Sequence, residues 1–169
     1  AFEKSGVVNL VQAYARHPEY LVNLLPSESI TSSFKELTDA DVYIIAVSDD
    51  AIATVSSQLP FNDRLVVHTS GSVPQEQMDP KNRRGVFYPL QTFSKSKDVD
   101  FTAIPLCLET EYEADYFLLE ELAKAISPHL FAINSGQRQA LHVAAVFVNN
   151  FVNHFYAIGS NICEENNIP

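Results

Sequence analysis

The residues best suited to chemistry in this 169-residue sequence follow short apolar runs. Arg16, Ser48 and the segment Thr69-Ser70-Gly71 each stand where a predicted strand ends. The carboxyl ends of parallel strands meet at one edge of an open α/β sheet, where such sheets bind ligands. An arginine in place of an acid after the second strand of a dinucleotide-binding fold favours a ribose 2′-phosphate. The spacing therefore predicts an NADP site with NAD less favoured, although a solvated surface arginine also fits Arg16.

A second set of polar residues has helical spacing near the C-terminus. At 100° per residue, one narrow stripe holds Arg138, His142, Asn149, Asn153 and Tyr156. Most of the remaining circumference is apolar, which predicts that this helix is buried and that its stripe faces something polar. We expect His142 and Asn149 to be catalytic, because a histidine can donate a proton or orient a carbonyl. Arg138 and Asn153 would bind the substrate.

Purely structural roles also fit these residues. A water-filled groove or a hydrogen-bond network between domains accounts for the same stripe, as do asparagines that pair across a dimer interface. Aromatic residues surround a proline between Phe87 and Phe93. Tyr88 in this run is expected to contact the substrate beside the nicotinamide, while a core-and-turn role fits the run equally well.

Glycine and histidine patterns limit the alternatives. The five glycines contain neither GxGxxG nor a P-loop, although a phosphate cradle needs glycines for close backbone approach. Residues 1–6 resemble the end of a helix closed by Gly6, and in dinucleotide folds such a helix directly follows the glycine turn. We therefore expect that the chain lacks the first strand and the glycine loop of its fold. No HExxH motif is present, and no metal site is predicted.

The elements that must position these residues alternate between strand and helix. Apolar runs predict strands at 7–14, 42–47, 65–69, 85–88, 104–108 and 129–133. Helices are expected after Pro18, from a Ser48 cap to 58, and from a Thr110–Glu113 capping box to 126. Asn134 or Ser135 then caps a helix over 137–166. This order predicts an α/β fold with a doubly wound, mostly parallel sheet over residues 1–134, and the first long helix of a second, helical domain over 135–169.

Composition excludes several other classes of protein. Eleven Lys and Arg against 21 Asp and Glu give a formal charge of −10. The chain therefore lacks the overall positive charge that a general nucleic-acid-binding protein needs. No apolar run approaches the roughly 20 residues of a membrane span. Cys107 and Cys163 show no CxxC spacing and fit reduced thiols. We expect a cytoplasmic protein with neither a membrane nor a nucleic-acid partner.

Three runs carry a resemblance to a known family: Val66 to Ser72, Gly85 to Ser94, and Leu141 to His154. They resemble bacterial NADP-dependent oxidoreductases that pair a Rossmann-like N-terminal domain with a C-terminal helical domain of unknown function. More distantly, the chain is similar to pyrroline-5-carboxylate reductase and prephenate dehydrogenase. The resemblance implies that Arg16 lies at the 2′-phosphate, that Ser48 and residues 69–71 follow the cofactor, and that His142 and Asn149 face the nicotinamide.

The resemblance also implies an activity and a partner. We expect hydride transfer between NADP and a small carbonyl, imine or hydroxy-acid substrate, and a homodimer formed through the helical domain. The alternative is a non-catalytic NADP-binding sensor or a dimeric scaffold protein.

Overall fold

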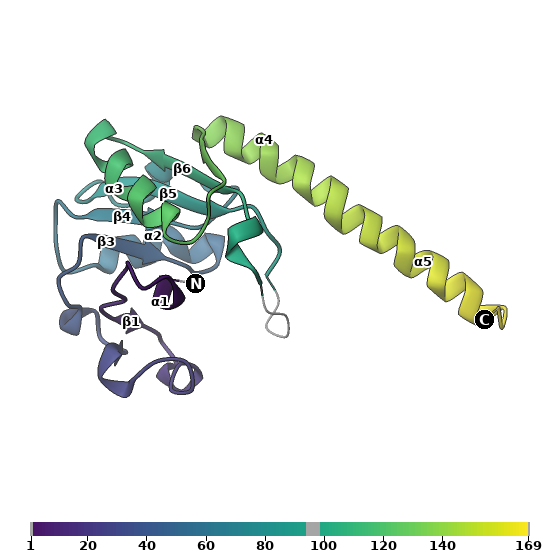
Figure 1. Ribbon diagram of the computed structural model, residues 1–169, viewed down its shortest axis with the longest axis horizontal. Helices are drawn as coiled ribbons and strands as arrows, with labels where there is room; N and C mark the ends of the chain where they lie inside the picture. Colours follow the sequence, from purple (N-terminus) through teal and green to yellow (C-terminus); the bar gives the residue numbers. More distant parts are fainter. Residues whose placement is uncertain (1, 94–98, 169) are drawn as a thin grey trace.

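A five-stranded sheet forms the centre of the computed structural model, which describes residues 2–93 and 99–168 (Figure 1). Its order follows the chain: β3 (Val42–Ile45), β4 (Leu65–His68), β5 (Arg83–Pro89), β6 (Leu106–Thr110) and β7 (Leu130–Ala132). Neighbouring strands are parallel except β5 and β6, which are antiparallel. The mostly parallel sheet and its covering helices confirm the predicted Rossmann-like class.

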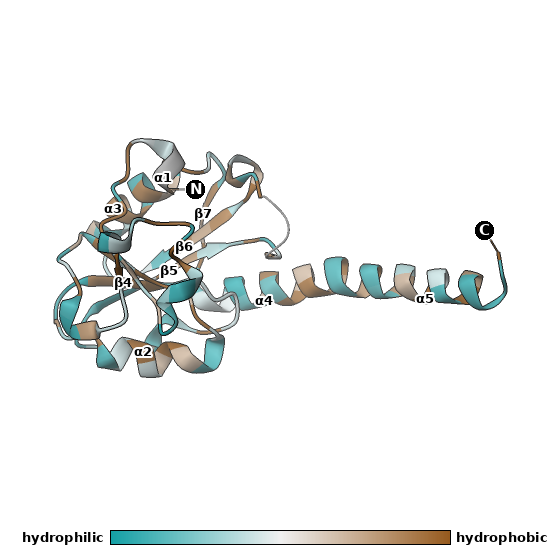
Figure 2. Cartoon of the chain, turned by 90° about the horizontal axis from the view of Figure 1, so that it is seen from below, coloured by the Kyte–Doolittle hydropathy of each residue, from teal (hydrophilic) through white to brown (hydrophobic). Residues whose placement is uncertain are grey.

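Helices cover both faces of this sheet, with α2 on one side and α1 and α3 on the other (Figure 2). On one face, Leu119 of α3 (Glu113–Lys124) packs with Val67 of β4, and Phe2 of α1 (Phe2–Ser5) packs against the same cluster. On the opposite face, Ile52 of α2 (Ile52–Gln58) packs with Val66. Strand β4 is buried on both sides, as its continuous apolar run predicts.

A small second sheet lies apart from the first. It pairs β1 (Ala13–Tyr14) with β2 (Ile30–Thr31) in parallel. Between β1 and the outer edge of β3 lies a cavity of about 950 Å³. Apolar side chains from both helical layers reach this cavity, among them Val55 of α2 and Leu122 of α3. The cavity therefore separates two strand edges and has a helix on either side.

The structure corrects the prediction for the N-terminal segment. Of the strand expected over 7–14, only Ala13 and Tyr14 form one, because Val7 to Gln12 border the cavity and none of the described strands lies beside them. The helix expected after Pro18 is a single 3-10 turn, Pro18–Tyr20. Gly6 closes α1 with φ +70°, which confirms the left-handed position expected of it.

Two predicted helix caps are wrong. Thr110 belongs to β6, and its Oγ1 donates to the Tyr112 carbonyl 3.0 Å away, so the helix begins at Glu113 without a side-chain cap. Ser48 precedes a 3-10 turn, Asp49–Ala51, that leads into α2, and the Ser48 side chain makes no cap hydrogen bond. In both cases, strand pairing or a tighter first turn fixes the backbone where the sequence suggested a capped α-helix.

The C-terminal segment is one continuous helical rod that extends away from the sheet (Figure 1). It consists of α4 (Ser135–Val146), a π-helical segment (Phe147–Phe151) and α5 (Val152–Glu165). Asn134 and Gln137 form a capping box at its start, which confirms the predicted cap. Among the described residues, no helix is both long and apolar enough to cross a membrane.

The prediction that this rod is buried is wrong for the chain as described. Beyond α4, its side chains lie in the open, and Val148 is 72% and Phe155 66% exposed. Periodicity shows which residues share a face of a helix, but it does not show whether another element covers that face. The element that α5 mainly contacts is the π-helical segment before it.

Candidate functional site

The turn after β4 satisfies most of its hydrogen bonds internally. The Ser70 hydroxyl accepts from the backbone N–H groups of Ser72 and Val73, both at 3.1 Å. The Ser70 N–H donates to Nδ1 of His68 at 3.1 Å. The Ser72 hydroxyl donates to the carboxylate of Asp49, just after β3. Ser70, predicted to contact a cofactor, thus shapes the turn, which leaves Thr69 and Gly71 as its better candidates for that contact.

Helix α4 holds this turn through the guanidinium of Arg138. The side chain is fully buried, and Nη1 donates to the carbonyls of Ser70 at 3.0 Å and Val73 at 2.9 Å. Nη2 donates to the carboxylate of Glu109 at 3.1 Å and to the Ser135 hydroxyl at 2.9 Å. All four hydrogens on the terminal nitrogens are therefore bound to protein. Arg138, predicted to bind substrate, ties the helix to the sheet instead.

The side chains of His142 and Tyr88 contact each other, and both rings lie close to Gly71. Tyr88, near the end of β5, has its hydroxyl 3.1 Å from Nδ1 of His142. The two rings approach edge-on, with centroids 6.1 Å apart. A Cβ on Gly71 would lie 2.5 Å from Nδ1 of His142 and 2.7 Å from Cζ of Tyr88, so only glycine fits beneath the pair. The structure thus brings together a predicted catalytic residue, a predicted substrate contact and a predicted cofactor contact.

Three ionisable side chains near this turn have shifted pKa values. Burial lowers the pKa of His68 to about 4, and the charge of Arg138 acts in the same direction. Burial raises the pKa of Tyr88, so the phenol keeps its proton. Burial also acts to raise the pKa of Asp49, but the hydrogen bond from Ser72 helps to bring it below the ordinary value. At neutral pH the turn therefore has a neutral His68 below it and a carboxylate beside it.

The outer part of the polar stripe forms a chain of amide hydrogen bonds. Nδ2 of Asn149 donates to Oγ1 of Thr92 at 3.0 Å, and Nδ2 of Asn153 donates to Oδ1 of Asn149 at 3.5 Å. Asn149 lies in the π-helical segment, a feature that often marks functional sites. Thr92 was not among the residues predicted from the sequence, although it lies in the aromatic run that includes Tyr88. Tyr156 is 76% exposed at the far end of the stripe.

The remaining predicted contacts lie after β1 and β3. Arg16 follows β1 and is exposed, and no ion pair to it is seen among the described residues. Ser48 lies three positions after the end of β3 and precedes Asp49. Both therefore occupy strand ends, as the spacing predicts.

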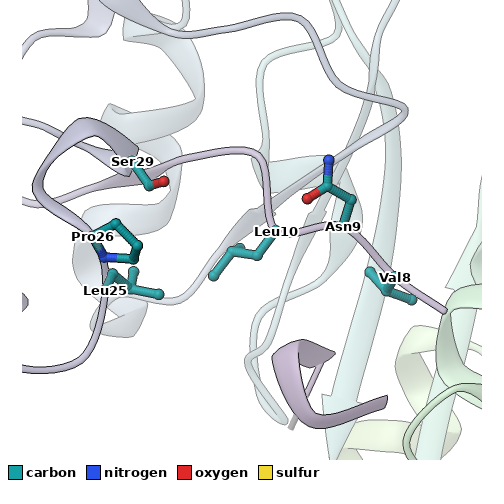
Figure 3. Close-up of a pocket in the computed structure, with 6 residues that line it drawn as sticks. All are labelled: Val8, Asn9, Leu10, Leu25, Pro26 and Ser29. Atoms are coloured by element: carbon teal, nitrogen blue, oxygen red, sulfur yellow. The ribbon is translucent and has the colours of Figure 1, made fainter. Parts of the chain in front are cut away.

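A separate surface pocket of about 260 Å³ offers little chemistry. Figure 3 shows its lining, which contains no ionisable side chain: Val8, Asn9, Leu10, Leu25, Pro26 and Ser29. Asn9 and Ser29 are its only polar side chains. The candidate site is therefore the strand-end cluster around Gly71, Tyr88 and His142.

The chain is similar to one family of proteins and to several solved structures. Residues 104–169 match DUF2520, a domain of unknown function, so the matched region also includes β6, α3 and β7. A Bacteroides fragilis protein described as a "putative NADP oxidoreductase" is 34% identical with a TM-score of 0.82, over 98% of this chain and 66% of that one. The resemblance inferred from the sequence is thereby confirmed. No curated protein matches the chain in sequence.

Two further solved structures share the fold. A Thermotoga maritima protein is 25% identical with a TM-score of 0.71, over 88% of this chain and 59% of that one. Prephenate dehydrogenase from A. aeolicus, solved with hydroxyphenyl propionate and NAD+, is 11% identical with a TM-score of 0.65, over 81% of this chain and 55% of that one. The last likeness shows the fold alone. The chain spans less than two thirds of the length of each of these relatives.

Proposed function

We propose that this chain is the nicotinamide-binding part of an NADP-dependent oxidoreductase acting on a small carbonyl, imine or hydroxy-acid compound. The observation that carries the proposal is the position of His142 and Tyr88 over Gly71, after β4 and at the end of β5. Parallel α/β sheets bind ligands at this edge. The names of the Bacteroides and A. aeolicus proteins, one with NADP and one solved with NAD+, support a nicotinamide cofactor.

The described residues fit the 2′-phosphate and the nicotinamide half of NADP better than they fit its pyrophosphate. Exposed Arg16 after β1 suits a 2′-phosphate, and Ser48, Thr69 and Gly71 lie at the strand ends that the nicotinamide half would follow. The described residues contain no glycine-rich turn for the pyrophosphate. We propose that one further strand fills the cavity between β1 and β3 and carries this turn, because both flanking strands are open edges.

The chain's own residues would bind and orient the substrate. Bound NADP supplies or accepts the hydride. His142 would face the reacting carbonyl or imine and orient it through a hydrogen bond from Nε2, which makes no hydrogen bond within the described residues. Asn149 and Asn153 would hold a polar group of the substrate in place of the hydrogen bond between them. Arg138 would act indirectly, by holding the turn against α4.

Cofactor binding is the direct test of this proposal. NADPH and NADH would be titrated into the chain extended at its N-terminus by one strand and a glycine turn. We expect NADPH to bind more tightly, and Arg16→Ala to weaken NADPH binding about tenfold or more while leaving NADH unaffected, because the lost contact is charge-assisted. Arg64→Ala, an exposed arginine that pairs with Asp39, is the matched control. Failure to bind either nucleotide would refute the proposal.

The alternative is a non-catalytic NADP-binding sensor or scaffold. The hydrogen bonds of Arg138 favour it, because they couple α4 directly to the turn after β4. The two functions differ at His142. In an enzyme, His142→Ala abolishes turnover and leaves NADPH affinity intact. In a sensor, no substrate from a panel of oxo acids, imines and hydroxy acids oxidises the bound NADPH.

The uncovered face of the rod supports a homodimer. Exposed apolar residues follow one another at intervals of three and four: Val148, Phe151, Phe155, Ile158 and Ile162. This spacing is typical of a helix that packs along another helix. We propose that a second copy of the chain covers this face.

A further inference from the structure

The hydroxyl of Tyr88 has one partner among the described residues. Tyr88 is 8% exposed, and its hydroxyl oxygen lies 3.1 Å from Nδ1 of His142. A neutral imidazole carries its hydrogen on one ring nitrogen and a lone pair on the other. If Nδ1 carried the hydrogen, it would donate to the Tyr88 oxygen, and the phenol hydrogen would find no acceptor in the described part of the chain. A buried O–H group without an acceptor costs about 1–3 kcal/mol.

We propose that Tyr88 is a positioning residue for His142 and holds the hydrogen of its neutral ring on Nε2. The inference rests on the proposed function, in which His142 faces the substrate. The phenol donates to Nδ1 of the neutral imidazole, which places the ring hydrogen on Nε2. The imidazolium carries a hydrogen on both nitrogens, so Nε2 bears one in that state as well. Burial raises the pKa of Tyr88, which keeps the phenol available as the donor.

The surroundings of the pair hold the two rings close together. Tyr88 lies in β5, which pairs with strands on both sides, and its backbone is opposite Cys107 of β6. Leu141, the residue before His142, packs against the cluster that contains Tyr88. Gly71 closes the third side, because a Cβ there would overlap both rings.

This arrangement defines the chemistry that His142 can offer. Since Nε2 bears a hydrogen in both protonation states, the substrate atom opposite it must be a hydrogen-bond acceptor. A carbonyl oxygen or an imine nitrogen meets this requirement, whereas an ammonium or a protonated iminium nitrogen does not. The inference narrows the substrate to a compound that presents an acceptor to the ring.

Nitrogen-15 NMR of the histidine rings tests the inference without cofactor or substrate. The spectra would be recorded at about pH 8, above the ordinary histidine pKa of about 6.5, and the His142 signals would be identified by their loss in His142→Asn. In the wild-type chain we expect Nδ1 at the shift of an unprotonated nitrogen and Nε2 at that of a protonated one. In Tyr88→Phe, both shifts should move toward the averaged values of exchanging tautomers.

The control is Tyr112→Phe, since Tyr112 is an exposed tyrosine before α3, and it should leave the His142 signals in place. A protonated Nδ1 in the wild-type chain overturns the inference, even if Tyr88→Phe fails to fold. Wild-type shifts retained in a folded Tyr88→Phe chain also overturn it. Unchanged signals of His68, which lies in the same sheet, would show that the variant is folded.

The experiments distinguish failure of the inference about Tyr88 from failure of the proposed function. If NADPH binds and His142→Ala abolishes turnover while Tyr88→Phe leaves the His142 shifts unchanged, only the role of Tyr88 fails. If the tautomer is as expected but neither NADPH nor NADH binds, the proposed function fails and the contact between the rings stands. In an active enzyme, we expect Tyr88→Phe to lower kcat about tenfold or more with KM for NADPH unchanged.

Discussion

The two halves of the C-terminal rod carry the same polar stripe in opposite surroundings. In the inner half, Arg138 is buried and His142 contacts Tyr88, so side chains of α4 reach the turn after β4. In the outer half, Asn149 makes one contact with Thr92, and Tyr156 lies in solvent. The inner half is packed into the α/β unit, while the side chains of the outer half are mostly exposed.

This difference shows that a polar residue on a helix stripe takes its role from what faces it. Arg138 and Asn153 occupy the same stripe, yet the arginine donates to backbone carbonyls and to Glu109. Within the described part of the chain, the Asn153 side chain hydrogen-bonds to Asn149 alone. Substitutions of a buried residue in the inner half, such as Arg138, should therefore affect folding. Those in the outer half should affect association or ligand contact.

The largest effect is expected for Arg138→Met. The change leaves the Glu109 carboxylate, which is 10% exposed, without its cation, and it leaves the Ser70 and Val73 carbonyls without donors. Removing one partner of a buried pair costs about 3–5 kcal/mol, and urea denaturation would measure this loss in the free energy of unfolding. Arg84→Met, which breaks the more exposed pair with Glu111, should cost about 1 kcal/mol or less. Equal losses in the two variants would contradict the distinction drawn between the halves.

A smaller effect is expected from pH, through His68 beneath the same turn. Its pKa is about 4 in the folded chain against an ordinary 6.5, so the unfolded chain binds a proton that the buried ring does not. The free energy of unfolding should therefore fall as the pH drops from about 6.5 to 4, by about 3 kcal/mol at most. His68→Gln should lose this part of the pH dependence, as measured by urea denaturation at several pH values. An identical slope in both chains would show that the ring is not held neutral.

The smallest effect on folding is expected in the outer half. Phe155→Gln removes an exposed ring, so the free energy of unfolding of the monomer should change by no more than about 0.5 kcal/mol. Self-association should nevertheless weaken about tenfold or more in sedimentation experiments, because the ring lies in the centre of the proposed contact face. His154→Gln, at the exposed neighbouring position, is the control and should leave association unchanged. If Phe155→Gln unfolds the chain instead, the outer half is not independent of the α/β unit.

Much of the fold could be predicted because the signals were local. The apolar run Leu65-Val66-Val67 predicted a strand buried on both faces, and Asn134 predicted the start of the rod. The strand expected over 7–14 failed for a non-local reason. Its apolar residues need a neighbouring strand that the described residues do not supply, and composition alone cannot reveal that.

The candidate site divides in the same way. Gly71 and His142 were selected from a strand end and a helix stripe, and the structure brings them into contact. The pairing of His142 with Tyr88, 54 positions earlier, depends on the position of α4 against β5 and was not visible in either motif. The role of Arg138 was missed because an arginine on a polar stripe has the same spacing whether it faces solvent or a buried carboxylate.

Besides the proposed dimer face on the rod, the open edge of β3 is a second surface through which copies of the chain would associate. Among the described strands, β3 pairs with β4 alone, and Ile44 and Val47 beside the cavity are partly exposed. An open apolar edge can add strands from other molecules without limit, and this growth leads to aggregates rather than to a dimer. Such aggregates would bind amyloid dyes and persist in Phe155→Gln. A strand seated between β1 and β3 would therefore protect the protein from aggregation as well as complete its sheet.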